Sequence, residues 1–439
     1  MSRLTLCALA LCASALLPSA FGEVKVFRNF TLIDGTGKPA VPSSAMIVTN
    51  GRITWIGPVD ALKAPAAAET IDLSGKFLMP GVVNTHTHIG NTVDLDQDKK
   101  NYTAESVEKN LKIFAEYGVT TAFSMGTDQD LIFKIRAVQR ASGRPTVARV
   151  FTAGQGLVFK GGYGGLAGVN RQFADVSEIP AAVDAQAAKH PDVIKFWMDD
   201  ELGHFPKMPY AMAKAIIDQA HKRHLRVLAH VFYLADATEL ANDGVDGFVH
   251  AVRDKPVDQA LLDSMKKHNT WQLAGTLERE ASMFAYGKTP AFLNDPLFVR
   301  AVSPNVIKIL SDPAHQKQIA SDPSYSQYPK IFEMAKANYK KEADSGIRYA
   351  MGTDTGPPGR FPGFGEHWEM ELMQEAGLTP MQVIVASTRT GAEFLDAKDL
   401  GTIEKGKWAD LLVLDANPLD DIHNMRKIAS VWIGGNKVD

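Results

Sequence analysis

The stretch Gly81-Val82-Val83-Asn84-Thr85-His86-Thr87-His88 decides how this sequence is interpreted, because a short apolar run leads into two histidines spaced two positions apart. In an extended chain, side chains two positions apart point to the same face, so both imidazoles can reach one metal ion. An isolated His-x-His more often belongs to a half-buried strand with hydrogen-bonded histidines. The interpretation therefore depends on whether further ligands follow the same pattern.

Four further residues with ligand chemistry lie in or at the ends of apolar runs. Lys195 interrupts the run Val193–Trp197, and three later runs end on His230, His250 and Asp354. A single histidine at a strand end is usually a hydrogen-bonded core residue. Six ligands at strand ends predict a catalytic metal centre at one mouth of a β/α barrel.

Lys195 has two interpretations. An unpaired ammonium inside an apolar strand is costly to bury, so a snorkelling or salt-bridged lysine is the ordinary one. Beside two metal cations, burial and like charge would both lower the pKa of the amine. The neutral amine can then take up carbon dioxide, and the resulting carbamate is an anionic bidentate ligand that can bridge two metals.

These residues resemble the metal-dependent amidohydrolase superfamily, specifically its binuclear type with a carboxylated lysine, which includes imidazolonepropionase- and prolidase-like enzymes. The family places an HxH pair on strand 1, a lysine on strand 4, histidines on strands 5 and 6 and an aspartate on strand 8. All six occur here in that order. The flanking segments Met79–Asn84 and Gly401–Asp415 are similar to the family's entry into strand 1 and its C-terminal return.

The expected fold is α/β, a (β/α)8 TIM barrel with a flanking β-sandwich domain built from both chain ends. Strand-like runs alternate with helical patterns such as Tyr210–Arg223. The eight runs lie near 80–86, 119–124, 146–153, 192–198, 225–230, 247–250, 270–275 and 347–354. The expected division is residues 1–22 as a signal peptide, 23–79 and 398–439 as the two parts of the sandwich, and 80–397 as the barrel. Residues 276–345 form a long excursion that is either a lid or a surface decoration.

The N-terminus has the pattern of a secretory signal peptide. Arg3 supplies a positive charge, residues 4–17 are apolar, and small residues surround a cleavage point after Gly22. The apolar run is short for a membrane span, so we expect a periplasmic or secreted protein with no membrane attachment after cleavage. Cys7 and Cys12 both lie in this segment, which leaves the mature chain without thiols or disulfides.

The charge balance of the chain gives no indication of a polyanionic partner. The chain has 47 Lys and Arg against 50 Asp and Glu, a net charge of −3; removing residues 1–22 takes away Arg3 alone, giving 46 against 50, or −4. The cationic residues are scattered, which argues against nucleic-acid binding. The expected partner is a small-molecule or dipeptide-like substrate, and a homo-oligomer is left open.

The resemblance implies a mechanism and a ligand assignment. Two divalent ions, with zinc as the first candidate, would share the Lys195 carbamate and a bridging hydroxide. His86, His88 and Asp354 would hold the deeper ion, and His230 and His250 the more exposed one. Asp354 is also the expected catalytic proton carrier. Tyr233, three positions after His230, could donate its hydroxyl to the developing oxyanion.

Three more residues are candidate substrate contacts. Tyr163 lies in the Gly-rich stretch 161–165, where related dipeptidases often have a substrate-binding histidine. Arg253, three positions after His250, could pair with a substrate carboxylate or with Asp254. His367 could line the mouth of the barrel, or start the helix that follows it.

The function expected from these residues is hydrolysis of an amide or peptide bond, with dipeptides or N-acyl amino acids as leading substrates. A lactonase or an organophosphate- or carboxyl-ester hydrolase would use the same binuclear site. A deaminase of the superfamily is disfavoured, because the His-x-x-Glu pattern is absent after His230 and Lys195 is present. A non-catalytic periplasmic binding protein should have lost at least one ligand, and none is missing.

Overall fold

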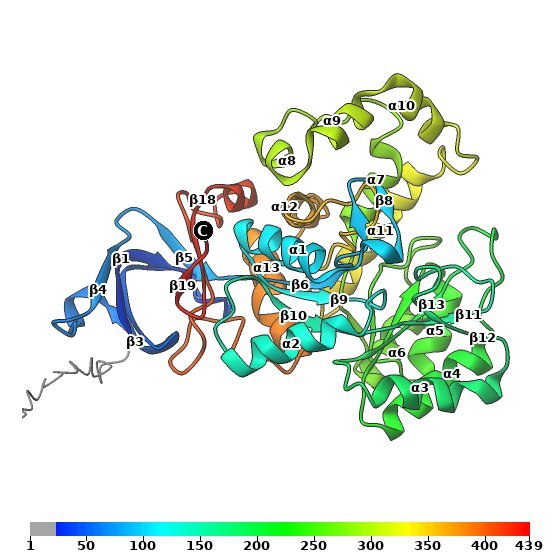
Figure 1. Cartoon of the computed structure of the whole chain (residues 1–439), viewed down its shortest axis with the longest axis horizontal. Helices are drawn as coiled ribbons and strands as arrows, with labels where there is room; N and C mark the ends of the chain where they lie inside the picture. Colours follow the sequence, from blue (N-terminus) through cyan, green and yellow to red (C-terminus); the bar gives the residue numbers. More distant parts are fainter. Residues whose placement is uncertain (1–22) are drawn as a thin grey trace, which may run out of the picture.

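The computed structural model describes residues 23–439, so the predicted signal peptide lies outside the described residues. Figure 1 shows a β-sheet at one side, parallel strands with their helices in the centre, and a helical excursion standing out from the body. Within the described range, we find no helix with the length and apolar character that crossing a membrane requires.

Both ends of the described chain contribute to one mixed sheet, ordered β19-β18-β17-β5-β1-β2-β3, with β4 pairing to β1. The strands are β1 (Val24–Leu32), β2 (Val41–Thr49), β3 (Arg52–Pro58), β4 (Glu69–Asp72), β5 (Phe77–Pro80), β17 (Leu411–Leu414), β18 (Ile428–Ile433) and β19 (Asn436–Lys437). Phe27, Phe30, Leu411 and Trp432 lie in the core beneath this sheet. The arrangement is consistent with the expected β-sandwich domain.

The central strands form two parallel sheets, ordered β10-β9-β6 and β12-β11-β13-β14-β15-β16. Their bounds are β6 (Val82–Thr87), β9 (Val119–Ser124), β10 (Arg149–Thr152), β11 (Leu157–Phe159), β12 (Arg171–Phe173), β13 (Ile194–Met198), β14 (Val227–Val231), β15 (Gly247–Phe248) and β16 (Trp271–Gln272). Every residue of β6, β9, β13 and β14 is buried. Burial on both faces is typical of a parallel sheet covered by helices.

In the described chain, these two sheets do not join into one closed barrel. The prediction of a last strand at 347–354 is wrong. Tyr349 bridges to Gln272 and Thr355 bridges to Thr87, but no ladder continues between them. Asp354 adopts a left-handed backbone with φ +67°, and its N–H donates to the carbonyl of His86. This turn ends the extended conformation just where the predicted ligand lies.

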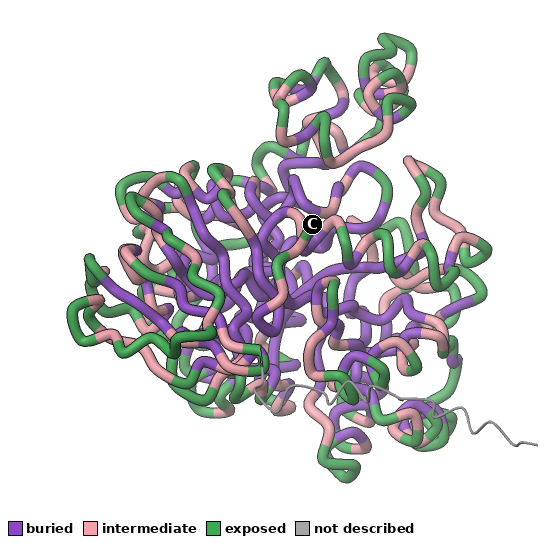
Figure 2. The backbone as a smooth tube through the Cα atoms, turned by 60° about the vertical axis from the view of Figure 1, so that its left-hand side comes forward, coloured by how far each residue is buried: buried purple, intermediate pink, exposed green. Residues whose placement is uncertain are grey.

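Helices cover the parallel strands, and Figure 2 shows the buried backbone running through the middle of the molecule. They are α1 (Ala104–Glu116), α2 (Leu131–Ser142), α3 (Ile179–Ala187), α4 (Tyr210–Lys222), α5 (Leu234–Asn242), α6 (Gln259–His268), α12 (Phe364–Glu375), α13 (Pro380–Val385) and α14 (Gly391–Phe394). The helix predicted at Tyr210–Arg223 is confirmed to within one residue. Thr103 and Ser106 form a capping box at the start of α1, as the sequence chemistry of helix N-termini favours.

The excursion at 276–345 contains α7 (Leu277–Ala285), α8 (Pro296–Ala301), α9 (Pro304–Ser311), α10 (Pro313–Ala320) and α11 (Tyr328–Asp344). The first six residues of α7 are buried, so this helix is part of the protein interior. Helices α8 to α10 stand out from the body (Figure 1). An apolar cluster that includes Phe298, Phe361 and Phe364 anchors α8 to the start of α12.

Candidate metal centre

The strand β6 brings the first two predicted ligands to one place. The His86 ring donates Nδ1–H to the Val249 carbonyl at 3.0 Å, and His88 Nδ1 lies 2.8 Å from the Thr127 hydroxyl oxygen. Both Nε2 atoms face the same carboxylate oxygen, Asp354 Oδ1, at 3.4 Å from His86 and 2.9 Å from His88. Each ring therefore has one anchored nitrogen and one nitrogen directed at the carboxylate.

The next strands contribute the other two histidines. The His230 ring, on β14, donates Nε2–H to Asp199 Oδ2 at 2.7 Å, and His250 Nδ1 lies 2.7 Å from the Thr276 hydroxyl oxygen. The centroids of the two rings are 3.9 Å apart. Burial lowers the pKa of His230 to about 4 against the opposing charge of Asp199. The ring is therefore neutral near pH 7, as a metal ligand must be.

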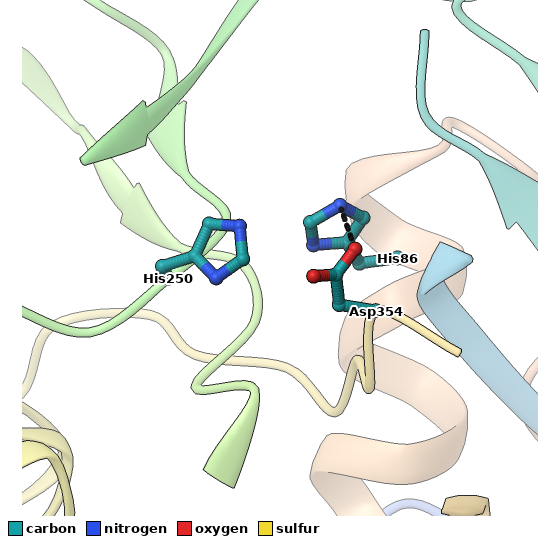
Figure 3. Close-up of side chains that lie close together, drawn as sticks. All are labelled: His86, His250 and Asp354. Atoms are coloured by element: carbon teal, nitrogen blue, oxygen red, sulfur yellow. Dashed lines mark ion pairs between the residues drawn. The ribbon is translucent and has the colours of Figure 1, made fainter. Parts of the chain in front are cut away.

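Three of these side chains form a compact group that could hold a metal ion. Ligand atoms of His86, His250 and Asp354 all lie within 4.8 Å of one another, and all three residues are buried. In Figure 3 the His250 ring faces the His86 ring and the Asp354 carboxylate across the centre of the group. His88 and His230 flank it, with His86 to His88 centroids 5.4 Å apart.

Lys195 lies on β13 and is only 1% exposed. Its Nζ atom has no hydrogen-bond partner among the described residues and lies 4.1 Å from the centre of the Trp197 ring. Burial lowers the pKa of this amine to about 7, although the Asp354 charge opposes the shift. Its charge in turn lowers the pKa of His86, His88 and His230.

Asp354 connects the group to an arginine that the sequence did not single out. Its Oδ2 atom accepts a hydrogen bond from Arg360 Nη1. Burial alone would raise the pKa of Asp354, but the charges of Arg360 and His86 hold it well below its usual range. Because Arg360 lies in a loop rich in proline and glycine rather than at a strand end, no periodicity pointed to it.

A cavity of about 230 Å³ opens onto these residues. His86, His88, His230, His250 and Asp354 line it together, with Gln97, Thr127, Tyr163, Gly164, Gly165, Trp197, Pro357 and Arg360 as the remaining lining residues. Five of the six predicted ligands thus share one cavity, and Lys195 lies beneath the Trp197 ring. No lining residue comes from the excursion 276–345.

The two tyrosines singled out in the sequence differ in their surroundings. The Tyr163 ring lies 5.4 Å from the His230 ring, and its hydroxyl accepts a hydrogen bond from Arg279 Nη2 at 3.2 Å. The Tyr233 hydroxyl instead donates to Asp200 Oδ1 at 2.6 Å, and Tyr233 does not line the cavity. This geometry differs from the expected oxyanion contact of Tyr233, because its O–H already donates to Asp200.

Two other predicted contacts lie outside the cavity lining. Arg253 is buried and pairs with Glu280 at 3.0 Å, whereas Asp254 Oδ1 accepts from the Leu234 N–H. His367 lies in the first turn of α12, as one of its two interpretations held, and its Nε2–H donates to the Tyr117 carbonyl at 3.0 Å. In this structure His367 thus fits the second alternative, as a residue of the helix start.

The donor set fits a metal ion. His86, His88, His230 and His250 each have one ring nitrogen anchored by a second residue, which fixes the ring and leaves the other nitrogen as a ligand. The Nε2 atom of His86 is buried without a hydrogen-bond partner among the described residues, a costly state that a ligated ion would relieve. Neutral imidazoles with one carboxylate are a ligand set that divalent transition metals favour.

Comparison with known proteins agrees with this fold. Residues 77–438 match the sequence model of the Amidohydrolase family, and the chain belongs to that family. An uncharacterized protein of Mycobacterium tuberculosis is 27% identical over 226 residues, which is 50% of this chain and 54% of that protein. The chain thus spans about half the length of the curated mycobacterial relatives that it matches. The imidazolonepropionase of Streptomyces griseus is 21% identical over 94% of this chain and 97% of that protein.

Solved structures share the fold over nearly the whole chain. A Xaa-Pro dipeptidase with bound methionine in its active site has a TM-score of 0.73 at 19% identity, covering 94% of this chain and 99% of that chain. The Aspergillus niger ochratoxinase has a TM-score of 0.72 at 19% identity, covering 95% and 97%. At these identities the likeness concerns the fold alone.

Proposed function

We propose that this protein is a binuclear metal-dependent hydrolase that cleaves an amide bond in a small substrate such as a dipeptide or an N-acyl amino acid. One observation carries the proposal: five ligand-type side chains line a single cavity, and a buried amine without a hydrogen-bond partner among the described residues lies against Trp197 of the same lining. The binuclear type of amidohydrolase that the sequence resembles uses that combination, whereas a purely structural histidine cluster has no need of the amine.

Lys195 is the proposed site of the carbamate. With a pKa of about 7, a large share of the amine is neutral at physiological pH and can react with carbon dioxide. The carbamate would convert a buried group without a partner into an anionic ligand. His86, His88 and Asp354 would hold one ion, and His230 and His250 the other, with zinc favoured by the nitrogen-rich donor set. When bound, such ions lower the pKa of water toward neutrality and polarise a carbonyl group.

The chain's own residues would then orient the substrate and move the proton. Asp354 has one oxygen facing His86 and His88 and the other held by Arg360, so its carboxylate is fixed in direction. From this position it can accept a proton from the attacking water and pass it to the leaving nitrogen. Tyr163 accepts its hydrogen bond from Arg279, which leaves its own O–H free to donate to a substrate oxygen.

Two further parts of the proposal concern the fold and the location. We place the two parallel sheets and the 349–355 segment as the parts of a (β/α)8 barrel, because the bridges Thr87 to Thr355 and Gln272 to Tyr349 link them in that order. We also propose that the protein is exported, on the signal-like pattern of residues 1–22. Cell fractionation with N-terminal sequencing of the recovered protein tests this, and a cytoplasmic protein that retains Met1 would contradict it.

The test of function is amine release from a panel of dipeptides, N-acyl amino acids, lactones and phosphotriesters, with acid or alcohol release followed for the esters. The zinc-loaded protein should hydrolyse amides. Lys195→Ala should lose both turnover and bound metal, whereas Lys222→Ala, an exposed lysine at the end of α4, should lose neither. A Lys195→Ala protein with two metals and full activity would rule out the carbamate. Hydrolysis of the esters but not of the amides would instead indicate a lactonase or a phosphotriesterase.

A further inference from the structure

The lining of the cavity at the metal centre includes one cationic side chain that is not itself a proposed metal ligand. Arg360 lines the cavity, and its side chain is 20% exposed. Among the lining residues, all of which belong to the described range, it alone carries a permanent positive charge. The other ionisable residues of the lining are the four histidines, Asp354 and Tyr163.

Contacts on both sides of Arg360 fix the backbone of its loop. The Gly356 N–H donates to the Arg360 carbonyl at 2.9 Å, and the Arg360 N–H donates to the Pro357 carbonyl at 3.1 Å. Gly356 lies so close to His88 that a Cβ atom there would be 1.8 Å from the His88 carbonyl oxygen. Phe361 is buried in the aromatic cluster with Phe298. A side chain presented from a fixed turn loses little freedom on binding a ligand.

Most of the hydrogen-bonding capacity of Arg360 is unused. A guanidinium has five N–H donors, and Nη1 donates to Asp354. Within residues 23–439, Nε and Nη2 have no protein acceptor, and neither atom is among the buried ones. These two nitrogens are therefore accessible and unpaired in the described chain, and the Nε/Nη2 edge of a guanidinium suits a carboxylate.

The other arginines near the site are already neutralised. Arg253 and Arg279 are both buried and share Glu280, at 3.0 and 2.8 Å. Arg279 has a second carboxylate, Glu201, at 3.8 Å. Neither of them lines the cavity, so an anionic substrate group that enters it meets Arg360 as the guanidinium of the lining.

We propose that Arg360 binds the α-carboxylate of the substrate and thereby selects amides whose leaving amine is an amino acid. Asp354, the carboxylate that would deliver a proton to the leaving nitrogen, touches Arg360 directly. A group held by Arg360 therefore lies next to that nitrogen, and the α-carboxylate is one carbon away from it. This inference rests on the proposed function, because it assigns one end of the substrate to one side of the same cavity.

A binding experiment tests the carboxylate site without requiring turnover. The metal-loaded full chain is titrated by calorimetry with 3-phenylpropanoate and with the neutral 3-phenylpropanamide. The native protein should prefer the carboxylate by ~10- to 100-fold, the range for a hydrogen bond to a charged group. Arg360→Gln should lose most of that preference. Arg171→Gln, an exposed arginine on β12, is the matched control and should keep it.

Equal affinities in the native protein, or an unchanged preference in Arg360→Gln, would overturn the proposal. Should Arg360→Gln fail to retain metal, Arg360→Lys replaces it, since lysine keeps the charge but cannot make the bidentate contact. The preference should then be reduced rather than lost. An Arg360→Lys protein with the native preference would contradict a bidentate site.

Kinetics separates carboxylate recognition from a merely structural role of the ion pair to Asp354. N-chloroacetyl-L-phenylalanine and N-chloroacetyl-2-phenylethylamine differ only by the carboxylate. If Arg360 recognises that group, Arg360→Gln should lower kcat/KM for the first substrate ~10- to 100-fold more than for the second. An equal loss on both would mean that Arg360 only positions Asp354. Carboxylate-selective binding without hydrolysis of either compound would refute the amide assignment and leave the carboxylate site standing.

Discussion

The Nε2–H of His230 donates to Oδ2 of Asp199 at 2.7 Å, and both side chains are buried. This contact fixes which ring nitrogen of His230 remains for a metal. Asp199 comes directly after β13, the strand that carries Lys195. The same strand therefore supplies one proposed ligand and the residue that orients another.

Removing the charge of Asp199 should weaken metal binding without removing a ligand. Asp199→Asn should lower metal affinity ~10- to 100-fold, the usual loss when a partner behind a ligating histidine is changed. Competition with a chelator measures this directly. Asp200→Asn is the matched control, because the neighbouring Asp200 contacts Tyr233 rather than a ligand. Equal affinities in the two variants would mean that the His230 contact has no role in holding the metal.

Substitution of Tyr163 and substitution of Tyr233 should have different effects on kcat. Tyr163→Phe should reduce kcat on an amide substrate by about 10- to 100-fold, because the hydroxyl lies in the cavity and its proton is free to donate. Tyr233→Phe should change kcat only a few-fold, since its hydroxyl is bound to Asp200. The reverse ranking would restore the role that the sequence predicted for Tyr233.

Glu342 on α11 should make stability depend on pH. Both of its carboxyl oxygens are buried with no hydrogen-bond partner in the described chain, and burial raises its pKa to about 8 from the ordinary 4.5. In the unfolded chain the group ionises near 4.5, whereas the folded protein retains the proton. Its contribution to the free energy of unfolding is therefore complete below pH 4.5 and is lost as the pH rises through 8.

Replacing that carboxyl by an apolar group of similar size should remove the dependence. Glu342→Met should gain about 2–4 kcal/mol over the native protein between pH 5 and pH 8, at about 1.4 kcal/mol per pH unit at most. Urea unfolding at several pH values measures it. Glu333→Met, an exposed site on the same helix, should show no such gain. Parallel pH profiles for the native and Glu342→Met proteins would show that Glu342 is not buried as a neutral acid.

Gly356 should be the most sensitive glycine of the site. It has φ +120°, and a Cβ atom would lie 1.8 Å from the His88 carbonyl oxygen, so Gly356→Ala combines backbone strain with a steric clash. We expect a loss of more than about 2 kcal/mol in stability together with loss of bound metal. Gly346→Ala is the matched control, with φ +78° and no atom within 4 Å of the added Cβ.

Gly346→Ala should lose only about 1 kcal/mol of stability, the usual strain for alanine with positive φ, and should keep its metal. Thermal unfolding and metal analysis of both variants distinguish the two effects. If Gly356→Ala resembles the control, the contact between the 356–361 loop and His88 is not essential.

The positions of the ligands could be predicted because each lies in or at the end of an apolar run, a pattern that the sequence displays directly. The same reasoning did not predict the backbone conformation at Asp354. The ligand position was visible, but the left-handed turn that replaces the last predicted strand depends on hydrogen bonds from Thr353 and Asp354 to a carbonyl on β6. No local pattern encodes such a contact between distant segments.

The groups around the ligands were less predictable. Arg360 lies in a loop whose prolines and glycines indicate a turn, but the direction of its side chain depends on packing against His88 and the Phe298 cluster. Arg253 had two plausible partners in the sequence, and its actual partner, Glu280, comes from a helix that no spacing relates to it. Asp199 did carry a signal, since an acidic residue directly follows the strand of Lys195.

The pairing of β5 with β17 has a consequence for how the chain matures. β5 leads directly into β6, and its antiparallel partner is β17, near the other end of the chain. Contacts between such distant segments form late, because a long loop must close first. A nascent polypeptide therefore cannot complete the support of the His86 strand until its final segment has left the ribosome, so a chain interrupted late in translation should be unable to acquire metal.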